Sequence, residues 1–456
     1  MSLLSWYPLI KDYKNYGLDS EDLTVMGTVP FSDGKLGNAA TYTNAPSNCL
    51  NRTGFKLESD FSWACWVKVD AETSSSVEYI LSEGRDVGSM GINIQFQKST
   101  KTLLLQGTGV TQNFITDITY GTWYHLAFTC STTGYKGYVN GNLVFTTTSF
   151  TTIDYAQSAD RFVIGKMAYN YTSTGSYFPF YGQVQDVRIY DHVLSVKEIK
   201  ELAKGLVMHL PLDWGDSTRN PESSSANYTA LDFGTKYLTD CSGFNNPVSA
   251  IGSNNTACSN SPRYLSGTTC GASSCINLGQ SIKLQPPFSF AFWFNTSNLA
   301  YGSNRLISCT ESGGWNVEGA SSSSYGTGLD FVISAGSYRH LPTTKTQAEL
   351  VNGWHHIVCT YDGLKSQVYI DGVLDVETTY FTTFTNITYN ASNAVLLGGE
   401  ATRSSTTGQT YAVPTSFSDF RFYASILSAE DVQQVYKIPF SIDHTGKFYG
   451  FNLTEV

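Results

Sequence analysis

Charged side chains are scarce in this chain: Asp, Glu, Lys and Arg make up 14% of its 456 residues, against roughly 25% in an average soluble protein. The formal net charge is -10, and the 28 Lys and Arg residues form no run. Because binding to a phosphate backbone needs clustered cations, we expect no nucleic-acid partner. No apolar stretch approaches the roughly 18 residues that a spanning helix needs, so we expect no membrane partner either.

The chain is also poor in the features that build helices or direct secretion. Its 29 Tyr, 26 Phe and 40 Gly residues favour strands and turns, which disfavours helical bundles, coiled coils and α/β enzymes. The opening segment, MSLLSWYPLIKDYKN, lacks the basic start, long apolar core and cleavage site of a signal peptide, so we expect synthesis in the cytoplasm without secretion. The hydrophobic content of 41% suffices for packed cores, and the length suggests two domains.

An internal repeat organises the sequence. Three segments recur in order about 230 residues later: FSWACWVKVD (61–70) as FSFAFWFNTS (288–297), WYHLAFTC (123–130) as WHHIVCTY (354–361), and DVRIYDHVLS (186–195) as DFRFYASILS (419–428). One domain has therefore been duplicated. We place the boundary after Lys204, which gives domains at 1–204 and 205–456, the second ending in a strand-turn-strand tail (438–456).

The local patterns predict strands with few helices. Alternating apolar residues mark strands, and Asn140-Gly141 and Asp371-Gly372 predict type I′ hairpin turns. Ser195 with Glu198, and Ser428 with Asp431, form capping-box patterns, so each domain should close with a short helix. The expected fold is all-β: two tandem antiparallel β-sandwich jelly rolls.

Four ordered elements occur in both halves: an opening P-L, F-S-x-x-x-W, W-x-H followed by Y-x-[ND]-G, and D-x-R-[IF]-Y-x-x-x-L-S. They resemble the laminin-G-like, concanavalin A-like lectin/glucanase superfamily, which implies curved sheets with sugars or proteins bound on a concave face or on rim loops. The superfamily includes lectins, hydrolases, lyases, adhesion modules and inert spacers, so fold alone does not fix function. The tandem arrangement resembles virion proteins of tailed phages, such as fibres or decorations.

No catalytic motif is found. Relatives that hydrolyse glucans carry E-x-D-x-E on one strand, and the nearest matches, at 58–62 and 375–379, lack the third acid. We therefore predict no catalytic residues and a non-enzymatic protein. An unrecognised glycan hydrolase or lyase stays an alternative, and it would need two carboxylates about 5 to 9 Å apart in one cleft.

Duplicated polar residues favour structural roles. His125 and His356 occupy matching positions, but no duplicated acid accompanies them, so we interpret both as core residues. Asp186 with Arg188, and Asp419 with Arg421, alternate with apolar residues and predict same-strand ion pairs. Calcium stays an open alternative, without assigned ligands, because acids such as Asp216, Asp240, Glu311, Asp330 and Asp362 form no D-x-D-x-D series.

Sugar binding needs an exposed aromatic plane beside planar polar groups. The Gly/Ser-rich segment 312–328, expected to be an exposed loop, offers Trp315, Asn316, Glu318 and Tyr325, with Arg339 nearby; segment 167–178 offers Tyr169 and Tyr171. Tyr- and Ser-rich loops also suit protein surfaces. These seven residues are the predicted ligand site, with packed Ω-loops or virion contacts as the alternative.

The nine cysteines match no zinc-ribbon spacing, and both a Cys270–Cys275 disulfide and free thiols stay open. The resulting hypothesis is a non-enzymatic protein of the virion surface that binds host-cell or mucus glycan, assembles with other virion proteins and forms a homo-oligomer, with a trimer favoured. The alternative is a purely structural head-fibre, collar or capsid-decoration protein without a ligand.

Overall fold

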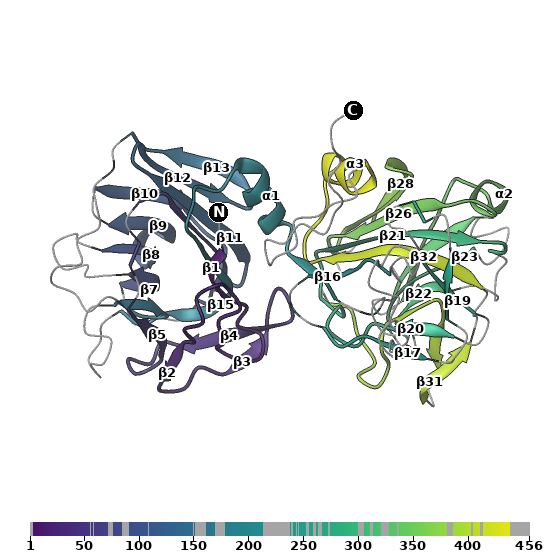
Figure 1. The fold of residues 1–456 in the computed structure, drawn as a ribbon, viewed down its shortest axis with the longest axis horizontal. Coiled ribbons are helices and arrows are strands. Elements are labelled where there is room, and N and C mark those ends of the chain that lie inside the picture. The colour runs from purple at the N-terminus through teal and green to yellow at the C-terminus, as the bar shows by residue number, and fades with distance from the viewer. Residues whose placement is uncertain are drawn as a thin grey trace, which may run out of the picture. The chain divides into compact units, whose positions relative to one another are not determined.

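The chain divides into two compact units in the computed structural model, unit 1 at Met1–Gly205 and unit 2 at Leu206–Val456 (Figure 1). The structure describes residues 3–437 except 55, 58, 72–75, 84–90, 108, 149, 151–160, 169–177, 213–237, 239, 243, 245, 252–254, 259–260, 263–266, 272–273, 300–304, 311–312, 321–327, 335–336, 381–385, 403–404 and 411–413, with the backbone alone for 400–402 and 405–410. The tail predicted at 438–456 lies outside these residues.

Unit 1 is built from two antiparallel sheets. The strands of its first sheet are β1 (Leu3–Tyr7), β3 (Phe31–Asp33), β4 (Asn38–Thr43), β6 (Phe61–Val69), β11 (Trp123–Ser131), β12 (Gly134–Val139), β13 (Asn142–Thr146) and β15 (Tyr181–Tyr190). Those of its second sheet are β2 (Thr24–Met26), β5 (Cys49–Thr53), β7 (Val77–Glu83), β8 (Ile92–Gln97), β9 (Thr102–Gly107), β10 (Val110–Ile115) and β14 (Arg161–Ile164). The orders are β13-β12-β11-β6-β15-β4-β3, with β1 beside β15, and β10-β9-β8-β7-β14-β5-β2.

Unit 2 repeats this plan. The strands of its first sheet are β16 (Leu206–Leu210), β18 (Thr256–Cys258), β19 (Gly267–Cys270), β21 (Phe288–Thr296), β26 (His355–Tyr361), β27 (Lys365–Ile370), β28 (Val373–Thr379) and β32 (Thr415–Tyr423). Those of its second sheet are β17 (Ser249–Ile251), β20 (Cys275–Asn277), β22 (Arg305–Ser308), β23 (Gly314–Gly319), β24 (Leu329–Ser334), β25 (Tyr338–Pro342) and β29 (Leu396–Leu397). The orders are β18-β19-β32-β21-β26-β27-β28, with β16 beside β32, and β17-β20-β29-β22-β23-β24-β25; β30 (Glu400–Thr402) and β31 (Ser405–Thr410) pair separately.

Helices are few and short: α1 (Val196–Ala203), α2 (Gln347–Leu350), α3 (Ala429–Lys437) and the 3₁₀ turn η1 (Lys98–Thr100). The predicted capping box of α1 is present, with Ser195 and Glu198 bonded reciprocally. Both hairpin turns have two consecutive residues at positive φ, as type I′ requires. The predicted all-β fold with two sandwiches is therefore confirmed. No helix in the described part of the chain is long and apolar enough to cross a membrane.

The core of unit 1 lies between its two sheets. Along β6, Phe61, Trp63, Cys65 and Val67 point inward and belong to one cluster with the inward residues of β8 and β9. Because side chains alternate along a strand, the other residues of β8 and β9 face away from the first sheet. This alternation creates the face on which the candidate site lies.

The first sheets of the two units have a bulge at matching positions. Asp186 (φ 53°) and Asp419 (φ 51°) adopt left-handed backbone conformations, and each carboxylate accepts from the arginine two residues on, with Nε–Oδ1 distances of 2.9 and 2.8 Å. The predicted same-strand ion pairs are thus confirmed. Trp6 donates its indole N–H to Asp186 (2.7 Å), whereas a histidine, His209, lies 3.0 Å from Asp419 in unit 2.

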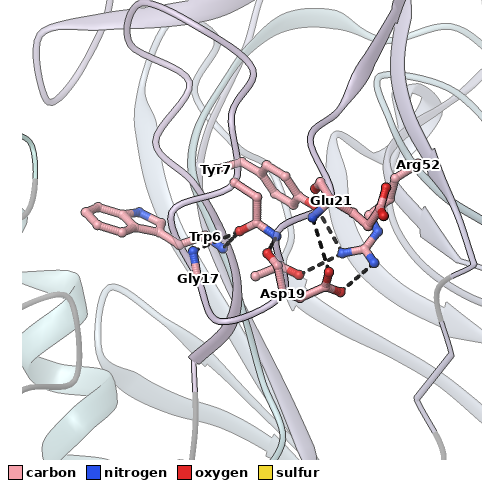
Figure 2. Close-up of polar contacts among 8 residues, drawn as sticks. Trp6, Tyr7, Gly17, Asp19, Glu21 and Arg52 are labelled. Atoms are coloured by element: carbon pink, nitrogen blue, oxygen red, sulfur yellow. Dashed lines mark hydrogen bonds and ion pairs between the residues drawn. The ribbon is translucent and has the colours of Figure 1, made fainter.

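An N-terminal loop is clipped onto unit 1 by a buried arginine (Figure 2). The guanidinium of Arg52, on β5, donates to Asp19 (2.5 Å), to the hydroxyl of Ser5 (2.9 Å) and to that of Tyr7 (3.2 Å). Tyr7 in turn donates to the backbone oxygen of Glu21 (3.1 Å). The clip holds the segment after β1 against the end of the sandwich.

Candidate functional site

The structure corrects the prediction that Trp315 lies on an exposed loop. Trp315 is on β23, is fully buried, and stacks on Phe290 with ring centroids 4.7 Å apart and planes at 21°. The segment GWNVEG alternates with a period of two, and Gly313 and Gly314, both at positive φ, turn the chain into the strand. A ring enclosed between two sheets offers no surface to a sugar, so Trp315 is a core residue.

Among the other predicted ligand residues, the three that the structure describes do not lie on one face. Asn316 and Glu318 share the opposite face of β23, where the Asn316 amide donates to Glu318 (3.1 Å). Arg339 lies opposite the core residue Ile333 across β24 and β25, and its guanidinium stacks 4.4 Å from the Tyr380 ring, so it belongs to the other face. Tyr169, Tyr171 and Tyr325 lie outside the described residues.

Sequence reasoning missed the outward face of the second sheet in unit 1. Ile92, Ile94 and Phe96 of β8 point into the core, so Asn93, Gln95 and Gln97 point out. Strand pairing places Gln95 beside Tyr79 of β7 and Leu104 of β9, and Thr111 of β10 beside Gln106 of β9. In Figure 1 these four strands lie side by side in unit 1.

A groove of about 360 Å³ lies on this face. Its lining in the described chain is Val77, Tyr79, Gln95, Gln97, Leu104, Gln106, Thr111 and Phe178. The floor is formed by buried side chains of Tyr79, Gln95 and Leu104, and the rim by exposed side chains of Gln97, Gln106 and Thr111. These eight described lining residues are uncharged, and they offer hydrogen-bonding groups and ring surface.

Two aromatic rings meet at one side of the groove, Tyr79 from the floor and Phe178 beside it. The Tyr79 and Phe178 ring centroids are 5.8 Å apart with planes at 39°, and the Tyr79 backbone N–H donates to the Phe178 carbonyl oxygen (3.1 Å). Phe178 has φ 52°, a left-handed conformation that is costly for a bulky residue and that recurs at ligand-binding positions. The backbone hydrogen bond and the ring contact with Tyr79 hold Phe178 in this conformation.

The floor amide of Gln95 has an unused acceptor. Its Nε2 donates to the Gln106 side-chain oxygen, while its Oε1 is buried and without a hydrogen-bond partner among the described residues. The side-chain oxygen of the neighbouring Asn93 is likewise buried and without a hydrogen-bond partner among the described residues. An unsatisfied buried acceptor costs about 1–3 kcal/mol, which a ligand hydroxyl reaching Gln95 would recover.

Unit 2 carries a different chemistry on the matching face. YILS (79–82) and GINIQ (91–95) of unit 1 correspond to RLIS (305–308) and GWNVE (314–318) of unit 2, and both second sheets have a bulge at the first of these strands. Ser82 and Asn93 are retained as Ser308 and Asn316. By strand register, Tyr79, Gln95, Leu104 and Thr111 are replaced by Arg305, Glu318, Asp330 and His340.

These four side chains contact one another in two pairs. Arg305 forms an ion pair with Glu318, and His340 Nδ1 lies 2.6 Å from Asp330 Oδ2. Burial raises the pKa of Asp330, opposed by the hydrogen bond from His340. Its other oxygen accepts from the Leu341 N–H (2.9 Å). Glu318 and Asp330 are direct cross-strand neighbours, the only arrangement of two facing carboxylates on a second sheet that the described chain shows, but both already have partners.

The remaining sequence predictions concern a histidine, the cysteines and a metal site. His125 is buried and packs edge-on against Trp66 (5.2 Å), and burial lowers its pKa to about 4, which confirms the structural interpretation. None of the nine cysteines forms a disulfide, so the Cys270–Cys275 bridge is not formed. Within the described residues no three His, Cys, Asp or Glu side chains gather as a metal site, and calcium stays a prediction.

Comparisons with known proteins give a family and several distant folds. The family model described as the concanavalin A-like lectin/glucanases superfamily matches residues 37–200 and 271–433. The chain is similar to domain 4 of AbnA, a GH43 extracellular arabinanase of Geobacillus stearothermophilus solved with arabinotriose, at 22% identity over 44% of this chain and 98% of that one, with a TM-score of 0.37.

It is also similar to two toxin domains. The binding domain of botulinum neurotoxin DC, solved with rat synaptotagmin II, shares 15% identity over 52% of each chain with a TM-score of 0.37. The receptor-binding domain of botulinum neurotoxin type G shares 18% identity over 52% of each chain with a TM-score of 0.34. The chain thus spans about half the length of these toxin domains. No curated protein matches the chain significantly.

Proposed function

The chain belongs to the concanavalin A-like lectin/glucanases superfamily, and from this premise we propose that it is a carbohydrate-binding protein whose ligand occupies the groove of unit 1. The observation that carries the proposal is the pairing of two aromatic rings with a buried, unused amide oxygen on one sheet face. Membership of the superfamily alone does not select a site, because its members differ in function.

The groove has the two surfaces that a sugar needs. A pyranose ring has an apolar C–H face, which packs on aromatic rings such as Tyr79 and Phe178, and a rim of hydroxyls, which pair with planar amides such as Gln95, Gln97 and Gln106. Sites for small molecules in proteins combine these features in clefts of 300–1,000 Å³. The volume of about 360 Å³ is at the low end of this range, which suits a short saccharide.

The proposal is non-catalytic because the lining lacks acids. Glycoside hydrolysis uses two carboxylates that flank the scissile bond, and no described lining residue has one. The facing carboxylates Glu318 and Asp330 of unit 2 favour the hydrolase alternative, but their ion pairs and burial leave no acid for a substrate. If the full chain released reducing sugar, and if Glu318→Gln and Asp330→Asn each abolished this release, the hydrolase alternative would replace the proposal of a binding protein.

The test is saccharide binding by the purified chain and two variants. A broad glycan array identifies a ligand, and titration calorimetry then compares wild type with Tyr79→Ala and Gln95→Ala. We expect each variant to weaken binding about tenfold, as loss of ring contact or of a buried hydrogen bond implies. Asn113→Ala is the matched control, because Asn113 is exposed on the same face but outside the groove. Equal weakening in the control, or no binding to any glycan, contradicts the proposal.

We further propose a biological setting, which the sequence resemblance alone supports. The chain is displayed on the surface of a tailed-phage particle, as a homo-oligomer attached to other virion proteins, and the groove adheres to host-cell or mucus glycan. Antibody labelling of purified particles by electron microscopy tests display, and light scattering of the purified chain tests for the trimer. Labelled particles combined with silence on every glycan would leave a purely structural decoration protein.

A further inference from the structure

We infer that the groove of unit 1 selects uncharged saccharides and rejects acidic ones, with Gln95 as the specificity-determining residue. This inference rests on the proposed function and adds the substrate class. It starts from a comparison that the duplicated chain provides internally, because the same sheet face exists twice with different side chains.

The fold does not impose neutrality on this face. At the four positions where unit 1 has Tyr79, Gln95, Leu104 and Thr111, unit 2 has residues that include a guanidinium and two carboxylates. The second sheet of this sandwich therefore accepts charges on its outward face when they are paired. The uncharged lining of unit 1 is a property of the site and not of the architecture.

The unused atom at the floor is an acceptor. Gln95 Oε1 lacks a partner, whereas Gln95 Nε2 is engaged by Gln106. This oxygen is enclosed, so a hydroxyl from a neutral sugar can donate to it once the Gln95 side chain turns toward the groove. A carboxylate placed there has no proton to donate and would face the oxygen's partial negative charge. It would also lose its hydration without gaining a cation from the described lining residues, none of which is Lys or Arg. Burial of an unpaired charge is costly, so uronic and sialic acid residues should be excluded from the floor.

The volume limits the recognised unit. Water in the liquid occupies about 30 Å³ per molecule, so a groove of about 360 Å³ holds roughly a dozen non-hydrogen atoms, which is the size of one hexose. The exposed rim residues Gln97, Gln106 and Thr111 then meet the neighbouring sugars of a longer chain. Selection against charge applies to the one residue seated on Tyr79 and Gln95.

The experiment measures binding of paired saccharides that differ only in charge. Uncharged oligosaccharides and their uronate counterparts are titrated into the full chain at low and high salt. We expect binding of the neutral member, unchanged by salt, and at least 100-fold weaker binding of the acidic one. Equal binding of both overturns the inference while the proposed function stands. No binding of either overturns the proposed function, and the inference with it.

Two variants locate the specificity. Gln95→Glu introduces the unit 2 residue with little change in shape. It should weaken binding of the neutral ligand more than tenfold at a temperature where the variant is folded, although its buried carboxylate lowers the unfolding temperature. Gln97→Lys places a cation on the exposed rim, where it does not disturb folding, and should strengthen binding of the uronate at least tenfold. Unaltered binding of the neutral ligand by a folded Gln95→Glu protein, or unaltered discrimination in Gln97→Lys, would refute the assignment.

Discussion

Replacing Trp315 by alanine separates the two roles that this residue has been given. Trp315 is fully buried on β23 and stacks on Phe290 (4.7 Å). Truncating a buried Trp costs about 3–5 kcal/mol, and each kcal/mol lowers the melting temperature of a domain of 150–250 residues by about 2–4 °C. We therefore expect the melting temperature of unit 2 to fall by about 6 to 20 °C. Calorimetry measures this change.

Binding provides the second readout for this variant. The groove belongs to unit 1, so Trp315→Ala should bind saccharide normally at 10 °C, where the variant stays folded. Ile92→Ala is the matched control, since Ile92 occupies the equivalent inward position of β8; it should destabilise unit 1 and its ligand together. Lost binding in Trp315→Ala with an unchanged melting temperature would show that the tryptophan contacts ligand, and would refute the burial argument.

Three further predictions concern polar contacts within each unit. Asp419→Asn should destabilise unit 2 by about 3–5 kcal/mol, because it leaves Arg421 buried without its counter-ion; urea unfolding that matches wild type would contradict this. Burial opposes ionisation of Asp419, but Arg421 and His209 outweigh it and hold its pKa well below the usual 3.8. The ionised Asp419 therefore stabilises unit 2 fully above about pH 4, and this contribution falls as acid approaches the depressed folded pKa, so melting temperatures from pH 7 to pH 2 should be flat and then decline. Arg52→Met should cost about 1–3 kcal/mol by removing the hydrogen bonds to Asp19, Ser5 and Tyr7, and amide exchange at 15–23 should accelerate while exchange elsewhere in unit 1 does not.

Because the domain is duplicated, the fold could be predicted from the sequence. Repeats of F-S-x-x-x-W and W-x-H identified the same strands twice, and the caps and hairpin turns were set by local residues such as Ser195 and Asn140. Helix α2 was missed although its capping box, Thr346 with Glu349, was present in the sequence. Local signals of this kind act within four residues, so they need no knowledge of tertiary structure.

The groove could not be predicted from the sequence, for a physical reason. INIQFQ predicts a strand with polar residues on one face, but that pattern does not distinguish a solvated face from a binding one. The floor exists because β7, β8 and β9 are neighbours and because Phe178 arrives beside Tyr79 from a distant part of the chain. The prediction that Trp315 lies on an exposed loop was wrong because it relied on the Gly and Ser residues around it. The period of two in GWNVEG indicates the buried strand that the structure has.

The two-sided construction of the second sheet in unit 1 bears on how such a protein can evolve. The inward residues of β8 and β9 belong to the hydrophobic core of unit 1. The exposed rim residues Gln97, Gln106 and Thr111, on β8, β9 and β10, face away from that core. Surface substitutions of this kind usually change stability by less than about 0.5 kcal/mol. A lineage can therefore alter the glycan it recognises by single point mutations, each of them tolerated, with no intermediate that fails to fold.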